Sequence, residues 1–119
     1  MEVEGTDSRK LTALIGLGLR ARGAIVGVQQ VREAAKRGKL QLAIAAPDAS
    51  NNSLDKVLPL LRARGVEVLV GPAATELGSM VGRDATAVIG IVDRGLAKGI
   101  RALNLSALPG GREAGEGLG

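Results

Sequence analysis

The chain has 119 residues, about the size of one domain, and 45% of them are hydrophobic, so it can bury a single core. It contains no His and no Cys, which excludes the usual catalytic triads, disulfides and the nitrogen and sulfur ligands of ordinary zinc sites. It also lacks Phe, Tyr and Trp, so bases cannot stack on aromatic side chains as they do in common single-strand-binding modules.

The formal net charge is +4, and the positive charge is concentrated in one quarter of the chain. Residues 9–39 carry a single acid, Glu33, and the cations Arg9, Lys10, Arg20, Arg22, Arg32, Lys36, Arg37 and Lys39. Such clustering is typical of a phosphate-binding face, and it also occurs where cations only solvate a helix surface. A polyanionic partner is the interpretation that we carry forward.

Taken in chain order, the apolar residues of the first half alternate between helical and strand patterns. The expected elements are a helix at 9–22, a strand at 24–26, a helix at 28–37 and a buried strand at 40–46. Asp7 and Ser8 can cap the first helix, and Gly38 closes the second. Turn and cap residues at 48–52 then precede a third helix.

The third helix is predicted by an apolar stripe at helical spacing and ends at Gly65. Its members are Leu54, Val57, Leu58 and Leu61. Pro59 lies inside the stripe, where we expect it to kink the helix or restrict its start.

The second half continues the alternation, with strands at 66–70 and 86–92, a short helix at 73–81, and a last helix whose apolar face is Leu96, Ile100 and Leu103. Regular alternation of helices and strands predicts the α/β class. We expect a three-layer α/β/α sandwich with a central sheet of about four strands.

The apolar stripes also set the expected limits of the domain. We predict one domain over residues 9–104, a disordered N-terminus over 1–8 and a disordered Gly-rich tail over 105–119. No apolar run approaches the roughly 20 residues that span a bilayer, and the start of the chain is acidic where a secretory signal is basic. We therefore expect a cytoplasmic monomer without membrane contact.

Three apolar runs are followed by residues that could serve a ligand, namely Asp48, Gly71 and Asp93. Open α/β sheets place ligands at the carboxyl ends of strands, so the two carboxylates could hold Mg²⁺ in an enzyme. Alternatively, Asp48 and Asp93 cap the helices that follow them. Because no two acids form a pair in sequence, we expect no enzymatic activity, no metal and no cofactor.

A glycine-rich stretch inside the first helix superficially resembles a phosphate loop. Residues 16–23 lack the third glycine of the dinucleotide fingerprint and the Gly-Lys-Ser/Thr of a P-loop, and they do not follow a strand. We expect Gly16 and Gly18 to permit close helix packing instead.

The start of the second helix is the stronger candidate. Gln29 and Gln30 stand at a helix N-terminus, where unpaired backbone N–H groups favour a phosphate and side-chain amides can read base edges. Arg32 and Lys36 follow four residues apart on one face. These cations would then contact phosphates, and the amides would read the bases.

At this point the residues resemble a known family. The segment Gly27-Val-Gln-Gln-Val-Arg-Glu-Ala-Ala-Lys-Arg-Gly38 resembles, without gaps, the Gly-x-Asn-Glu-x-x-Lys-x-x-x-Arg-Gly segment of the ribosomal seven-Ae and thirty-e superfamily of kink-turn RNA-binding proteins. Leu77-Gly-Ser-Met-Val-Gly82 is similar to its Leu-Gly-x-Ala-x-Gly signature, and Leu58-Pro59 to its Leu-Pro. The segments at 48–50 and 91–98 look most like the bacterial YlxQ-like branch, a small ribosome-associated protein.

The resemblance implies an α/β/α sandwich that grips bent RNA with the second helix and two flanking loops. Residues implied to contact RNA are Gly27, Val28, Gln29, Gln30, Arg32, Lys36, Asp48, Arg83, Asp84, Ala85 and Thr86. Gln29 and Gln30 replace the Asn and Glu that read bases in the family, and Glu33 replaces a Lys. Because Arg32 and Lys36 flank Glu33, RNA binding in a broader sense is still expected.

We therefore expect a non-enzymatic protein that binds ribosomal or other structured, kink-turn-like RNA, with ribosomal proteins as further partners. The alternative is a protein-binding assembly or regulatory factor of the same fold, which would use the apolar loop at 80–85.

Overall fold

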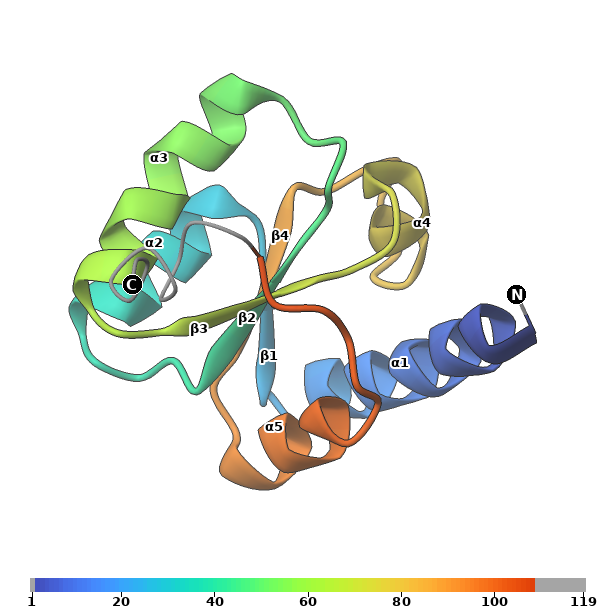
Figure 1. Cartoon of the computed structure of the whole chain (residues 1–119). Helices are drawn as coiled ribbons and strands as arrows, with labels where there is room; N and C mark the ends of the chain where they lie inside the picture. Colours follow the sequence, from blue (N-terminus) through green and yellow to red (C-terminus); the bar gives the residue numbers. More distant parts are fainter. Residues whose placement is uncertain (1, 109–119) are drawn as a thin grey trace, which may run out of the picture.

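The computed structural model describes residues 2–108, with side chains from residue 8 onward, and it alternates helices with strands (Figure 1). The helices are α1 (Glu2–Arg20), α2 (Val28–Lys36), α3 (Asn51–Ala63), α4 (Ala74–Ser79) and α5 (Arg94–Arg101). The strands are β1 (Ala24–Val26), β2 (Leu42–Ala45), β3 (Glu67–Val70) and β4 (Val88–Ile91). Every predicted element is present, and its bounds agree within a few residues except at the start of α1, which begins seven residues earlier than expected. α3 runs through Pro59.

The four strands form one sheet in the order β1-β4-β2-β3. β2 and β3 are parallel, whereas β4 is antiparallel to both of its neighbours, β1 and β2. Consequently β1, β2 and β3 all end at the edge where β4 begins. We call this the loop edge, since it holds the start of α2 at 27–30 and the connecting segments 46–50, 71–74 and 82–87.

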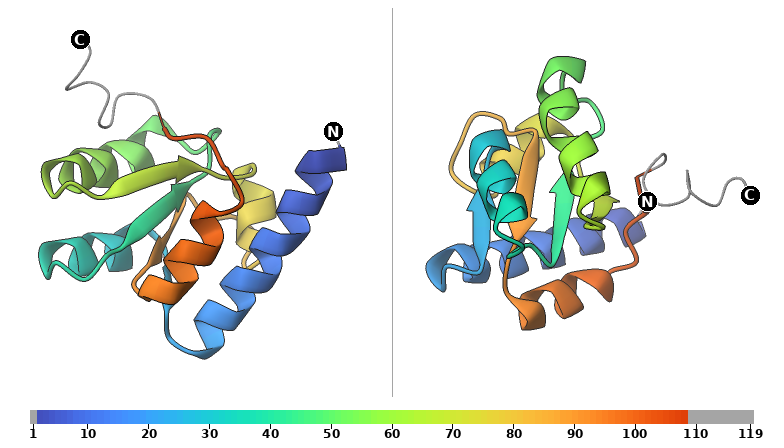
Figure 2. Two further views of the ribbon diagram at one scale, coloured as in Figure 1. Left: turned by 60° about the horizontal axis from the view of Figure 1, so that its bottom comes forward. Right: turned by 90° about the vertical axis from the view of Figure 1, so that its left-hand side faces the viewer.

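Side chains on the two faces of the sheet fill two separate cores, because neighbouring residues of a strand point to opposite faces. Leu42 and Ile44 join the core beneath α1, α4 and α5. Ala43, between them, joins the core beneath α2 and α3. Figure 2 shows α2 and α3 on one side of the sheet and α1 and α5 on the other. The three-layer α/β/α sandwich predicted from the sequence is confirmed.

Local polar groups explain where several helices begin and end. The Ser50 hydroxyl accepts a hydrogen bond from the Ser53 N–H at 3.1 Å and caps α3. Gly38 and Gly65 follow α2 and α3 with φ of 70° and 69°, the left-handed conformation in which glycine ends helices.

The two glycines of α1 differ in their surroundings. A Cβ built on Gly18 would lie 2.4 Å from Leu96 Cδ2 and 3.1 Å from Ala24 Cβ, so this glycine does permit close packing. Around Gly16, by contrast, there is no heavy atom within 4 Å of a built Cβ. The expectation of close packing was right for Gly18 and wrong for Gly16.

The expected disorder at both ends of the domain needs correction. Residues 2–8 form the first part of α1, which begins at Glu2. Acidic residues in this segment favour a helix N-terminus. Residues 106–108 pair with β3: the Val70 N–H donates to the Ser106 carbonyl at 2.7 Å, and the Leu108 N–H donates to the Val68 carbonyl at 2.9 Å. The remaining part of the predicted tail, 109–119, lies outside the described residues.

Among the helices of the described chain, none has both the length and the apolar character that crossing a membrane requires.

Candidate nucleic-acid interface

The start of α2 presents main-chain donors and two amide side chains at the loop edge. Gly27, with φ at 97°, precedes the helix in a backbone conformation that favours glycine. Its N–H donates to the Val88 carbonyl at 3.0 Å, which fixes it to the first residue of β4. No side chain caps α2, so its first turn keeps donors and a partial positive charge for a ligand. Gln29 and Gln30 are exposed beside them, and Val28 packs against the core below.

Asp48, predicted as an RNA contact, has a structural partner in the neighbouring loop. Its Oδ1 accepts a hydrogen bond from the Ala74 N–H at 2.7 Å, so it caps α4. The alternative that Asp48 caps the next helix along the chain is wrong, because Ser50 caps α3 and Asp48 bonds to the first turn of α4 instead. This bond ties the loop after β2 to the loop after β3.

The loop that precedes β4 is packed tightly on α4. A Cβ built on Gly78 would lie 2.5 Å from Ala85 Cα, so only glycine allows this approach. Arg83 donates its N–H to the Gly78 carbonyl at 2.9 Å, and Thr86 donates its N–H to the Ala74 carbonyl at 3.1 Å. Arg83, Asp84 and Ala85 are exposed, whereas Thr86 is 8% exposed and its hydroxyl lies 3.4 Å from the Val88 carbonyl.

These segments meet along the start of β4. The Ala87 carbonyl accepts a hydrogen bond from the Ala46 N–H at 2.9 Å, and the Val88 carbonyl accepts the one from Gly27 at 3.0 Å. The structure thus brings together the predicted segments 27–30, 46–48 and 83–86, which are far apart in sequence. Sequence analysis did not predict the main-chain hydrogen bonds that join these segments, because no pattern of side chains indicates such bonds.

The two residues of α2 predicted to contact phosphates lie apart from the other predicted RNA contacts. Arg32 Nη1 donates to the Lys56 carbonyl, so its guanidinium is turned towards α3. Lys36 is the last residue of α2, roughly 12 Å along the helix axis from Val28, and therefore lies towards the opposite edge of the sheet. The structure does not bring Lys36 together with the other predicted contacts.

The loop edge itself carries little positive charge. Its loops contribute one cation, Arg83, and the acids Asp48 and Asp84. Recognition at this edge must therefore depend more on hydrogen bonds and shape than on charge.

The carboxylates considered for Mg²⁺ lie at opposite edges of the sheet. Asp48 follows β2, whereas Asp93 follows the antiparallel β4, and its Oδ2 accepts the Leu96 N–H at 2.7 Å as the cap of α5. They cannot share a metal ion. Within residues 8–108 no cluster of three or more acidic side chains could hold one either.

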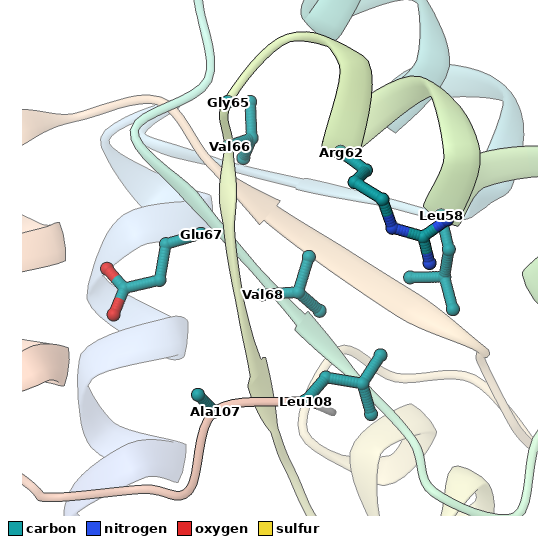
Figure 3. Close-up of a pocket in the computed structure, with 8 residues that line it drawn as sticks. All are labelled: Leu58, Arg62, Gly65, Val66, Glu67, Val68, Ala107 and Leu108. Atoms are coloured by element: carbon teal, nitrogen blue, oxygen red, sulfur yellow. The ribbon is translucent and has the colours of Figure 1, made fainter. Parts of the chain in front are cut away.

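A separate groove of about 350 Å³ lies at the outer edge of β3 (Figure 3). Leu58 and Arg62 of α3, Val68 of β3 and Leu108 contribute side chains to it. Glu67 points to the other side of the strand, where its Oε1 accepts a hydrogen bond from Arg101 Nε at 2.8 Å. The groove is thus mainly apolar and is not part of the loop edge.

Comparison with known proteins agrees with this architecture. Residues 9–100 match the model of the Ribosomal protein L7Ae/L30e/S12e/Gadd45 family. Among curated proteins, none matches the chain.

Two solved structures show the same fold. A protein of unknown function from Bacillus halodurans is 31% identical with a TM-score of 0.71, over 81% of this chain and 96% of that one. The 15.5kD RNA binding protein of Giardia lamblia is 23% identical with a TM-score of 0.65, over 82% of this chain and 84% of that one.

The family match spans most of the chain and includes every segment of the loop edge. Assignment to the YlxQ-like branch stays a prediction. The chain belongs to the Ribosomal protein L7Ae/L30e/S12e/Gadd45 family.

Proposed function

We propose that the chain is a non-enzymatic RNA-binding protein that holds a structured, kink-turn-like RNA at its loop edge. Membership of a ribosomal-protein family supports this proposal, as does the similar fold of a Giardia lamblia protein described as RNA-binding. On this proposal the protein acts as a cytoplasmic monomer on ribosomal or other structured RNA, next to ribosomal proteins.

The observation that carries the proposal is the convergence of an uncapped helix start with two fixed loops. The free N–H groups of the first turn of α2 suit a phosphate oxygen, and the amides of Gln29 and Gln30 suit the donors and acceptors of base edges. Tight packing of the loop at 83–86 on α4 gives the RNA a preformed surface. Binding then loses little conformational entropy in the protein.

The rival reading, a protein-binding factor, would use the apolar residues of the segment 80–85. Met80 and Val81 are partly buried against the core, which leaves Ala85 as the exposed apolar residue of that loop. A surface this small lacks the apolar centre of a stable protein interface.

The proposal is tested by the ratio of affinities for a kink-turn RNA and for a plain duplex of equal length. Replacing Gln29 and Gln30 together by Ala should cost about 1–3 kcal/mol on the kink-turn RNA and little on the duplex, borrowing the scale of base readout in DNA. Gln41→Ala is the matched control, because it removes the same amide at the opposite edge of the sheet. Equal affinity of the unaltered protein for both RNAs would refute the proposal.

A further inference from the structure

The positive charge of the chain gathers at the edge of the sheet opposite the loop edge. One row of the sheet there is formed by Ala24, Ile91, Leu42 and Glu67. The cations that lie within a few residues of this row form what we call the basic edge: Arg20, Arg22, Lys36, Arg37, Lys39, Arg64 and Arg94.

Main-chain bonds hold the segments of the basic edge next to one another. Val92 donates its N–H to the Gly23 carbonyl at 2.8 Å, and Gln41 donates its N–H to the Ile91 carbonyl at 2.7 Å. A Cβ built on Gly23 would lie 2.8 Å from Asp93 Cβ, so the turn that carries Arg22 is in close contact with the start of α5 at Arg94.

Two arginines are placed there by specific features of the backbone. Arg64 Nη1 donates to the Lys36 carbonyl at 3.1 Å, which brings its charge to the end of α2. Arg22 has a φ of 63° after α1, the left-handed position that Gly38 and Gly65 occupy after α2 and α3. An arginine is disfavoured in this conformation, so its side chain is present despite a conformational cost.

Carboxylates do little to neutralise these cations. Within residues 8–108 the one ion pair joins Arg101 to Glu67 of this row, and none of the seven cations of the basic edge takes part in it. Asp93 keeps its charge while its Oδ2 caps α5, and Glu33 is exposed one turn before the end of α2, so two acids stand against seven cations. Cations on adjoining segments add to one another's positive potential, most strongly where they lie within the screening length of about 8 Å in physiological salt.

We propose that the basic edge is a second RNA-binding surface, which binds the phosphodiester backbone of a helical segment without reading its bases. Arginines and lysines on adjoining loops suit a row of phosphates. A protein interface would need an apolar centre, whereas in the described chain a single large apolar side chain is strongly exposed, Leu17, one turn before Arg20 on α1.

This surface goes beyond the proposed function and does not depend on what binds at the loop edge. The two edges are separated by the length of the strands in a domain that measures 34 × 31 × 28 Å. The two surfaces therefore lie at opposite ends of the strands.

The test measures binding of a plain RNA duplex, without a kink turn, as a function of salt. Replacing Arg20, Lys39 and Arg94 together by Gln should make the log-log slope of affinity against salt shallower by about 2–3, since each phosphate contact contributes about 0.7–0.9. The matched control replaces Arg9, Lys10 and Lys56 by Gln, which removes the same charge from exposed positions elsewhere. Far-ultraviolet circular dichroism shows whether each variant is folded.

Equal loss of slope in both triple variants would overturn the proposal, because net charge alone would then explain binding. Binding of polyglutamate as tight as binding of the RNA duplex would also overturn the proposal, because the edge would then be assigned to an acidic protein. Replacing Gln29 and Gln30 by Ala should leave duplex binding unchanged; loss of duplex binding there would place the duplex at the loop edge. Absence of any kink-turn preference would refute only the function proposed for the loop edge.

Discussion

Gly78→Ala is the substitution that most directly tests how the loop edge is built. The new Cβ would lie 2.5 Å from Ala85 Cα and 2.7 Å from Ala85 N, whereas ordinary contacts begin near 3.4 Å. The obstacle is main chain and not the end of a flexible side chain. To relieve the clash, the loop at 83–86 must move by about 1 Å away from α4.

Free energy of unfolding should fall, because the loop cannot move freely. Hydrogen bonds from Arg83 to Gly78 and from Thr86 to Ala74 hold it at both ends. Overpacking of this kind costs about 1–3 kcal/mol, and replacing glycine by alanine in a helix returns at most about 1 kcal/mol. The net destabilisation should be about 1–2 kcal/mol.

Urea unfolding followed by far-ultraviolet circular dichroism is the suitable assay, because the chain has no aromatic residue to report on packing. With a denaturant slope of about 2 kcal/mol/M, the midpoint should fall by about 0.5–1 M. Gly16→Ala is the matched control, since it lies within α1 with nothing within 4 Å of the new Cβ, and it should be stabilising by about 0.5–1 kcal/mol.

The reasoning is refuted if Gly78→Ala is as stable as the unaltered protein. If the loop also supports RNA, the same variant should lose affinity for a kink-turn RNA and keep its affinity for a plain duplex.

Three further substitutions test the core, a helix cap and the proposed RNA contact. Leu61→Ala should cost about 2–5 kcal/mol in urea unfolding, because Leu61 is 0% exposed; a cost near zero would contradict its place in the core. Asp93→Ala removes the acceptor of the Leu96 N–H and should cost about 0.5–2 kcal/mol, most of which Asp93→Asn should restore; equal losses would show that the cap contributes nothing. Glu33→Lys should raise affinity for a kink-turn RNA in filter binding and steepen its salt dependence, and no gain would mean that α2 docks differently.

Much of the fold follows from short-range patterns in the sequence. Apolar spacing located each helix and strand, and the breaks between them fall at glycines such as Gly38 and Gly65, which have positive φ. The sandwich follows from alternation of the two kinds of element. Convergence of the segments at Gly27, Asp48 and Arg83 was implied by resemblance to the family.

The pattern of apolar residues did not indicate the direction of β4. A buried strand has the same pattern whether it runs parallel or antiparallel to its neighbours, so Asp48 and Asp93 appeared to follow equivalent strand ends. The cations at 9–39 also appeared to form one face, because clustering in sequence does not show how far apart a helix holds its two ends. In the structure, α2 begins at the loop edge and ends at the basic edge, and this separates Lys36 from Gln29 and Gln30.

Pairing of residues 106–108 with β3 matters for anyone who shortens this protein. A chain that stops at Asn104, where the apolar stripes end, would remove the partners of the Val70 N–H and the Val68 carbonyl. It would also expose an apolar outer strand, the kind of edge along which proteins join into aggregates. A stable fragment for crystallisation or spectroscopy should therefore extend at least to Leu108.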